Sequence, residues 1–270
     1  MAFLGGNDFM IKTKGLIAAC LLCSVPTWAE VVSIDFENGQ WHSGFDNIVF
    51  SKAGSEDSVS GIEITDKFVR QGKLAARFWR EADSGRMEHG YDRLHKYTDG
   101  SHKFYRASYF IDPNSTLESR KNGTIFQLKH TGLPLGKGTA KCIAVNTDGK
   151  SLTLDVRHYH PQQQRIRNKH TLLAELPVGR WFDIVVESKW SNKADGFYRV
   201  FVREQGSDKW QKQFEQLNIT TLANPKAPKK PVKGYFKVGT YAGPKVTVSK
   251  EIYLDDIRIA DSFIEATAMR

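Results

Sequence analysis

The stretch Tyr235-Phe236-Lys237-Val238-Gly239-Thr240-Tyr241 decides the fold assignment, because its side chains alternate as those of a β-strand do. The even-numbered side chains suit a face packed against a core. The odd-numbered positions place two tyrosines and a lysine in a row, with Gly239 leaving a gap before the second tyrosine. Core strands seldom carry this set on one side, so the stretch predicts a strand whose other face lines a ligand groove.

Short segments of the same kind recur along the chain and are separated by turn signals. We predict further strands at 31–36, 74–79, 104–111, 124–129, 141–145, 151–159, 181–190, 197–203 and 252–259. Residues 146–149 (NTDG) and 194–196 (ADG) predict hairpin turns. Helix signals are weak, and no internal repeat appears. Many short strands predict an all-β chain of two stacked antiparallel sheets, a concanavalin-like β-sandwich or jelly roll.

Residues 1–29 have the pattern of a secretory signal peptide. Two lysines precede a short apolar run at 15–25 (GLIAACLLCSV), and Ala29 is the small residue before the expected cut. The run is shorter than the roughly 20 apolar residues of a membrane-spanning helix. We therefore expect a signal peptide at 1–29 and one domain at 30–270 that is periplasmic or secreted, with no transmembrane segment.

Cysteine usage agrees with this reading. Cys20 and Cys23 leave with the signal peptide, so Cys142 remains alone and no internal disulfide is expected. A lone cysteine is more often a small buried apolar residue than a nucleophile. Residues 17–20 (IAAC) also resemble a lipoprotein cleavage box, so a lipid anchor on Cys20 is the alternative to release.

The chain is basic, with 39 Lys and Arg against 30 Asp and Glu and a formal net charge of +9. A basic exported protein favours polyanions, which include acidic polysaccharide, nucleic acid and membrane surfaces. A generally basic surface explains the composition equally well. The Pro- and Lys-rich segment 221–233 leads into the strand at 235–241, and we interpret it as either a solvated loop or a basic flap beside the groove.

Arg86-Met87-Glu88 would place an arginine and a glutamate on one face of a strand. Glu88 could then hold the guanidinium of Arg86, which matches a carboxylate with two parallel hydrogen bonds. A surface ion pair is the alternative interpretation of this pair.

Gln127-Leu128-Lys129-His130 closes another predicted strand. Gln127 and Lys129 share one face, and His130 falls on the core side unless the strand ends or bulges there. A structural histidine and a catalytic base are both open for His130. Residues 158 and 160 are histidines on the core phase of the strand at 151–159, which indicates structural roles for both.

The chain lacks the sequence patterns of several enzyme classes. There is no Cys/His metal cluster, no Gly-Xaa-Ser-Xaa-Gly elbow and no phosphate loop. Sandwich glycoside hydrolases need two carboxylates that flank the scissile bond. Residues 63–66 and 255–256 carry acidic pairs in the wrong phase for one groove face, so hydrolysis is weakly supported.

A polysaccharide lyase needs a different set of side chains. It removes the proton beside a uronate carboxylate and expels the oxygen on the neighbouring carbon. Arg, Gln or Lys can neutralise the carboxylate, and His or Tyr can transfer the protons. The three segments around Arg86, Gln127 and Lys237 supply all of these types.

The same segments carry a resemblance to the jelly-roll polysaccharide lyases, the alginate-, glucuronan- and heparin-lyase-like group. Residues 235–241 (YFKVGTY) resemble the signature strand of that family, 86–88 its arginine strand and 126–130 its Gln-His strand. The segment from Gly179 to Phe197 is similar to its back-sheet hairpin, and 253–257 to its closing strand. The resemblance covers most of residues 30–270 and implies cleavage of an acidic polysaccharide by β-elimination.

The resemblance also implies roles for individual residues. The implied catalytic residues are Tyr241, His130, Arg86 and Gln127, and the implied substrate-binding residues are Lys237, Lys129 and Tyr235. In the alginate-lyase pattern the histidine stands two residues after the glutamine, where this chain has Lys129. The base is therefore either His130, brought in by a bulge, or Tyr241, acting as both base and acid.

No cofactor is expected for catalysis, but jelly rolls of this kind often hold a structural calcium ion. Asp35, Glu37 and Asp256 are the carboxylates implied as its ligands, and solvated carboxylates are the alternative. We expect a monomer with an acidic polysaccharide as partner and no nucleic acid. A non-catalytic carbohydrate-binding sandwich is the principal rival, followed by a sandwich glycoside hydrolase. The identity of the uronan and the choice between internal and terminal cleavage stay open.

Overall fold

The computed structural model describes residues 31–39, 47–51, 61–80, 86–90, 95–116, 123–131, 139–146, 148–159, 165–222, 232–241 and 250–269. The expected signal peptide at 1–29 and most of the basic segment 221–233 lie outside these residues. No helix within the described ranges is long and apolar enough to cross a bilayer.

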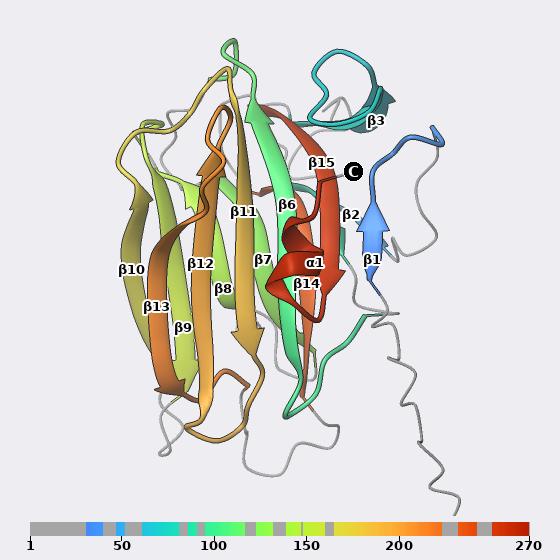
Figure 1. Ribbon diagram of the computed structural model, residues 1–270. Coiled ribbons are helices and arrows are strands. Elements are labelled where there is room, and N and C mark those ends of the chain that lie inside the picture. Colours follow the sequence, from blue (N-terminus) through green and yellow to red (C-terminus); the bar gives the residue numbers. More distant parts are fainter. Residues whose placement is uncertain are drawn as a thin grey trace, which may run out of the picture.

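Strands make up nearly all of the regular structure (Figure 1). The strands of one sheet are β1 (Val32–Ile34), β3 (Gly61–Thr65), β4 (Ala75–Arg80), β6 (His102–Ile111), β11 (Trp181–Lys189), β12 (Gly196–Glu204), β13 (Gln211–Ile219) and β15 (Lys250–Ala260). The strands of the other are β2 (Asn47–Ser51), β5 (Arg86–Gly90), β7 (Gly123–Thr131), β8 (Thr139–Val145), β9 (Leu152–Tyr159), β10 (Arg165–Leu173) and β14 (Lys233–Tyr241). A short helix, α1 (Phe263–Thr267), follows β15.

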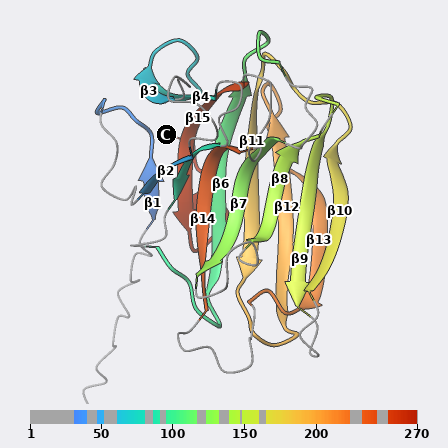
Figure 2. The same cartoon turned by 180° about the vertical axis from the view of Figure 1, so that it is seen from behind.

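The two antiparallel sheets stack face to face, as expected for a jelly roll. The order of the first is β13-β12-β11-β6-β15-β4-β3, with β1 also paired to β15. The order of the second is β10-β9-β8-β7-β14-β5-β2, so β14 lies between β7 and β5, and Figure 2 shows this sheet from its outer side. Neighbours that are distant in sequence, such as β14 and β5, therefore bring separate segments onto one surface.

The core lies between the sheets and takes the inward side chains of both. On β14, Phe236 and Val238 are buried in it, which confirms the predicted apolar face of this strand. The Phe236 ring packs on Phe126 of β7, with 4.6 Å between centroids, and on Tyr105 of β6, with 5.4 Å. Lys237, on the opposite phase, consequently points away from the core.

Phe236→Ala is expected to lower the free energy of unfolding by about 3–5 kcal/mol, because it leaves a cavity among aromatic rings of both sheets. Leu217→Ala is the matched control, since the Leu217 side chain is 45% exposed. Denaturant unfolding measures both. A loss for Phe236→Ala no larger than that of the control would show that β14 does not pack as described.

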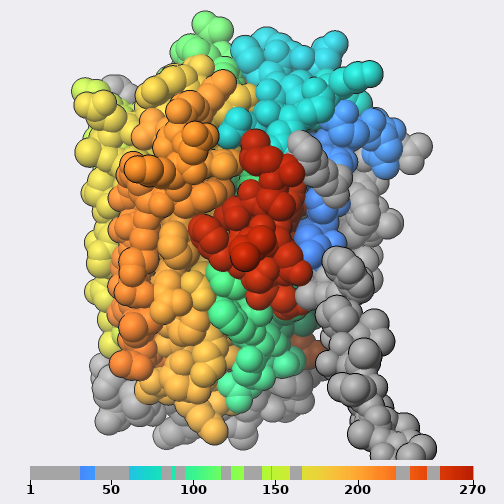
Figure 3. Space-filling model, in the orientation of Figure 1, coloured from blue at the N-terminus to red at the C-terminus, as the bar shows by residue number. Residues whose placement is uncertain are grey.

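Helix α1 covers part of the outer face of the eight-stranded sheet, where Figure 3 shows the C-terminal segment in red. Ser262 caps the helix and forms a capping box with Glu265. Arg106 of β6 donates to the carbonyl oxygens of Ala266 and Ala268, at 3.3 Å each. The helix therefore has a structural role on the part of this face that it covers.

Candidate active site

Strand register brings three distant segments together on the outer face of the seven-stranded sheet. Lys237 of β14 lies opposite Gln127 of β7, and Tyr241 lies opposite Arg86 of β5. Tyr241 also pairs with Thr124 of β7, after a shift in register. The polar side chains that the sequence pattern assigned to one groove thus come from adjacent strands.

Glu88 of β5 links two of these residues. Its carboxylate accepts a short hydrogen bond from the Gln127 amide and forms an ion pair with the Lys237 ammonium at 3.5 Å. All three side chains are nearly buried, with exposed fractions of 2% for Glu88, 5% for Gln127 and 4% for Lys237. Because a buried charge is costly unless it is paired, this carboxylate fixes both donors in one arrangement.

Gly239 has a different role from the one the sequence suggested. Its φ is +132°, and a Cβ there would lie 2.3 Å from the Met87 carbonyl oxygen and 2.7 Å from the Glu88 Cα. The missing side chain therefore makes room for the backbone of β5 and leaves no gap for a sugar. The expectation of an open space at Gly239 is wrong, and the close approach explains how Glu88 reaches Lys237.

A hollow of about 310 Å³ lies beside this cluster on the same face. Gln127 and Tyr241 line one side of it, together with Thr124 and Cys142. Tyr241 is half-buried, so its ring forms part of the wall. Of the implied catalytic residues, the hollow brings together Gln127 and Tyr241.

The other side of the hollow is strongly charged. Arg157 of β9 and Arg167 and Lys169 of β10 line it with Asp155. Asp155 accepts from both guanidinium groups, at 2.9 Å from Arg157 and 2.8 Å from Arg167. Although burial raises the pKa of Asp155, these hydrogen bonds outweigh it and lower that pKa below its usual value.

These charged residues were missed as site residues by the sequence reasoning. Arg157 alternates with the core-phase residues of the strand predicted at 151–159, which places it on the polar face, but no ligand role was drawn from it. The segment of β10, RIRNKHTLL, is polar without interruption from 167 to 171, so no alternation marked it as a strand. The available signal was the spacing of Arg167 and Lys169, which places two cations on one face of an extended chain.

Cys142 lies on this face, opposite Gln127 in the register. Its thiol is within 3.0 Å of the Thr124 hydroxyl, and burial raises the pKa of Cys142 to about 12. A thiol with so high a pKa stays protonated at neutral pH and is a poor nucleophile. The structure thus agrees with the expectation that Cys142 is not catalytic.

For three of the other implied site residues, Lys129, Tyr235 and Arg86, the structure gives the position on the sheet. Lys129 and Tyr235 are cross-strand partners next to the Gln127–Lys237 pair, and both side chains are half-buried. For Arg86 the backbone position opposite Tyr241 is described, while its side chain lies outside the described atoms. The predicted hold of Glu88 on Arg86 therefore stays a prediction.

His130 lies on the other face of β7. Its side chain is 4% exposed, its Nε2 lies 3.0 Å from the carbonyl oxygen of Thr221, and its ring meets that of Trp190 edge-on at 5.7 Å. Burial lowers the pKa of His130 to about 4. β7 continues as a strand through Thr131. Although its pairing with the neighbouring strands shifts in register, the His130 side chain stays on the core face, on the opposite side from Gln127 and Lys237.

The lowered pKa of His130 predicts a loss of stability in acid. The unfolded chain binds a proton near pH 6.5 and the folded chain only near pH 4, so stability falls as pH drops from 6.5 to 4. The total loss is about 3 kcal/mol. His130→Gln should remove this part of the slope, whereas His170→Gln, at an exposed histidine, should keep it. The free energy of unfolding in urea is measured for both variants between pH 4 and 6.5. An equal dependence on pH in the two variants would show that His130 is exposed to water and would contradict its burial.

The carboxylates implied as calcium ligands are held by donors of this chain. Asp256 pairs with Arg106 at 2.6 Å and with Arg258 at 2.7 Å. Glu37 accepts the backbone amides of residues 73 and 74, both at 2.9 Å. Among the described side chains no group of three or more His, Cys, Asp or Glu is arranged to hold a metal. Asp35, Glu37 and Asp256 therefore do not fit a calcium ion as one set.

Comparison with solved structures finds the same fold in several enzymes. An endo-β-1,4-glucuronan lyase from the fungus Trichoderma reesei matches with a TM-score of 0.64 and 16% identity, over 87% of this chain and 97% of that one. A PL-14 alginate lyase from Aplysia kurodai matches with a TM-score of 0.51 and 13% identity, over 84% and 97% of the two chains. An alginate lyase from Klebsiella pneumoniae matches with a TM-score of 0.50 and 9% identity, over 73% and 85%.

At these identities the solved structures establish the fold alone, and a search of the curated proteins found no match. The profile of the polysaccharide lyase family, by contrast, matches residues 36–258, which include all three segments of the candidate site. This range covers most of the chain and agrees with the resemblance carried by 235–241. The chain belongs to the polysaccharide lyase family, and it is a polysaccharide lyase.

Proposed function

We propose that this lyase binds a uronate-containing polysaccharide along the outer face of the seven-stranded sheet and cleaves it by β-elimination there. One observation carries the proposal: Gln127 and Lys237 already hold a carboxylate, that of Glu88, next to the hollow lined by Tyr241. The face is thus built to bind carboxylate beside a group that can transfer a proton.

The first requirement of the reaction is to neutralise the uronate carboxylate, so that charge can develop on it as the neighbouring proton leaves. The amide of Gln127 has two N–H donors and the ammonium of Lys237 has three, so each has donors beyond those that Glu88 takes. Donors fixed in advance stabilise developing charge without rearranging during the reaction. Arg86, opposite Tyr241 in the register, is the third proposed donor.

The second requirement is proton transfer. Tyr241 lines the hollow, whereas His130 faces the core, so we assign both proton transfers to Tyr241. The phenolate oxygen takes the proton from C5 of the uronate unit, the carbon that bears the carboxylate. The C4–C5 double bond then forms, and the bond between C4 and the glycosidic oxygen breaks. The same hydroxyl then returns the proton to the departing oxygen, and no water is consumed.

The charge on the far side of the hollow supports a polyanionic substrate. Arg157, Arg167 and Lys169 supply three cations against the one carboxylate of Asp155. The chain as a whole carries a net charge of +9, which attracts polyanions at long range. Of the three solved structures compared above, one is described as a glucuronan lyase and two as alginate lyases. From the signal pattern at 1–29 we further propose that the protein is exported. A monomer remains our expectation for its oligomeric state.

A panel of purified uronans tests the proposal. The protein is incubated with alginate, glucuronan and glycosaminoglycans, and with a neutral glucan as control, while the ultraviolet absorbance of a conjugated uronate is followed. A rise with at least one uronan and none with the glucan is expected. Binding of a uronan without that absorbance would favour a carbohydrate-binding module, and new reducing ends without it would favour a hydrolase.

A further inference from the structure

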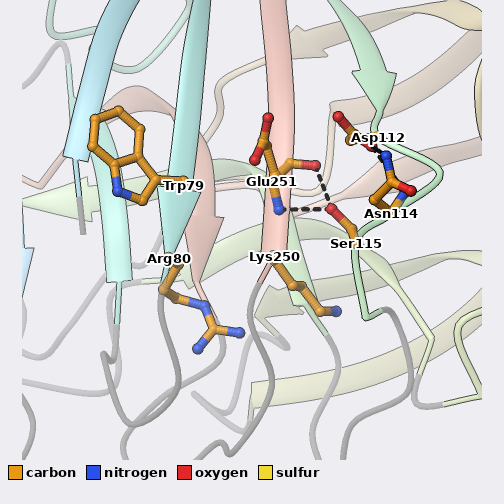
Figure 4. Close-up of a pocket in the computed structure, with 7 residues that line it drawn as sticks. All are labelled: Trp79, Arg80, Asp112, Asn114, Ser115, Lys250 and Glu251. Atoms are coloured by element: carbon orange, nitrogen blue, oxygen red, sulfur yellow. Dashed lines mark hydrogen bonds between the residues drawn. The ribbon is translucent and has the colours of Figure 1, made fainter. Parts of the chain in front are cut away.

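The hollow beside Gln127 and Tyr241 has the size of a ligand pocket. It encloses about 310 Å³, whereas a second hollow, at the end of the eight-stranded sheet, encloses only about 90 Å³ (Figure 4). Ligand pockets usually enclose about 300–1,000 Å³. In the smaller hollow the Ser115 hydroxyl donates to the carbonyl oxygen of Glu251 and accepts from its amide, which ties two walls together. Of these two hollows, the larger one therefore has room for a substrate that extends beyond the cleaved unit.

A row of facing residues crosses the outer face of the seven-stranded sheet through the larger hollow. From β14 through β7, β8 and β9 to β10, the register places directly opposite one another Lys237, Gln127, Cys142, Asp155 and Lys169. The last four of these residues line the hollow. Adjacent strands lie about 4.8 Å apart, so the four steps from β14 to β10 span roughly 19 Å. This length exceeds that of one sugar ring, so a polysaccharide laid across the strands places more than one unit over the row.

Small side chains keep the surface low along this row. The three strands between β14 and β10 contribute to the hollow the short side chains of Thr124, Cys142, Ala144 and Thr153. Larger side chains stand at its two ends: the ring of Tyr241 at one, and the guanidinium groups of Arg157 and Arg167 at the other. The hollow therefore joins the proposed catalytic end of the sheet to a cationic end on β9 and β10.

The cationic end is built around two arginines that face each other. Arg157 of β9 lies directly opposite Arg167 of β10, and like charges in facing positions destabilise a sheet. Asp155 offsets this repulsion, because its carboxylate accepts from Nε of Arg157 at 3.4 Å and of Arg167 at 2.9 Å, and from a terminal nitrogen of each. A guanidinium has five N–H donors, so each arginine has donors beyond those that Asp155 takes. With Lys169, three cations against one carboxylate leave this end with a net charge of +2.

The loops that join these strands add no carboxylate. Residues 132–138 (GLPLGKG), between β7 and β8, and residues 160–164 (HPQQQ), between β9 and β10, contain no Asp or Glu. Neither loop can therefore neutralise the two guanidinium groups. An incoming carboxylate is attracted by the excess positive charge even while Asp155 keeps both of its ion pairs.

We infer that Arg157 and Arg167, together with Lys169, bind the carboxylate of a second uronate on the same chain as the unit that is cleaved at Tyr241. Arginine suits this role because its planar fork can donate two parallel hydrogen bonds to a carboxylate. The substrate then lies across the strands, from Gln127 toward Lys169, and not along β14. This inference rests on the proposed function, and it narrows the substrate to polysaccharides in which uronates recur within the length of the row.

Arg167→Gln tests the inference, because the Arg167 side chain is 52% exposed and its truncation should leave the fold intact. Initial rates are measured with trisaccharides and hexasaccharides of glucuronan and of alginate, since only a chain seated at Tyr241 is cleaved. For the hexasaccharide that the parent protein cleaves, Arg167→Gln should raise KM roughly tenfold, because a hydrogen bond to a charged group is lost. The rise should be smaller for the trisaccharide, which covers less of the row, and kcat should change less than KM.

Arg180→Gln is the matched control for this variant. The Arg180 side chain is 62% exposed and is also paired with a carboxylate, that of Glu204 at 3.5 Å, but it lies outside the row. It removes the same charge, and KM for the hexasaccharide should stay at the parent value. Thermal melting of both variants checks that they fold.

Each outcome of the comparison decides the inference. A parent-like KM of Arg167→Gln for a hexasaccharide that is still cleaved would overturn it and leave the proposed function intact. Equal rises in KM for both oligosaccharide lengths, or for Arg180→Gln as well, would reduce Arg167 to a long-range attraction and also overturn it. If no uronan of any length is cleaved, the proposed function and this inference fail together.

Discussion

Tyr241→Phe is expected to lose nearly all turnover, by roughly 10²–10⁴-fold, while it folds normally and still binds the polysaccharide. The substitution keeps the ring that lines the hollow and removes only the hydroxyl that exchanges protons. Turnover is measured from the absorbance of the unsaturated product, binding by calorimetry and folding by thermal melting.

Tyr235→Phe is the matched control for this variant. Tyr235 lies on the same strand and the same face, opposite Lys129, and loses the same hydroxyl. It is expected to change substrate affinity only modestly and to keep the maximal rate. Near-normal turnover by Tyr241→Phe would show that Tyr241 does not transfer the protons. The base would then have to be another residue, and His130 is the alternative that the sequence offered.

Gln127→Ala is expected to lower turnover by roughly 10²–10³-fold, the effect of removing one donor aimed at developing charge. The loss should appear in kcat more than in KM, because the donor acts on charge that is largest in the transition state. Kinetics over a range of substrate concentrations separate the two parameters.

A structural role for Gln127 predicts a different pattern. Removing the amide leaves Glu88 with one donor fewer, so some loss of thermal stability is expected in either case. Gln213→Ala, on a strand of the other sheet, gives the baseline for a glutamine truncation. Unchanged kcat together with a lowered melting temperature would assign Gln127 to structure alone.

The fold followed from the sequence because most strands alternate over a buried face. The segments at 104–111, 181–190 and 235–241 each became a strand within two residues of the predicted bounds. β10 and β13 were missed because their polar residues do not alternate with apolar ones, and neighbouring strands hold them in the sheet. α1 was missed because five residues carry too little periodic signal, although the capping box at Ser262 and Glu265 is visible in the sequence.

The sequence predicted which face of its strand each candidate site residue occupies, but only some of the contacts between those residues. Alternation correctly separated Lys237 and Gln127 from the core, and it also placed His130 on the core side. The role of Gly239 could not be read from the strand alone, because it depends on how closely β5 approaches. The hold of Glu88 on two donors likewise depends on register between strands that are far apart in sequence.

The products of cleavage in water labelled with heavy oxygen test the elimination mechanism most directly. A uronan that the protein degrades is digested in such water, and the fragments are weighed by mass spectrometry. Elimination at Tyr241 predicts that the two new ends together weigh the same as the intact chain and contain no heavy oxygen. A gain of one water at each cut, with heavy oxygen in a new end, would show hydrolysis and contradict the mechanism.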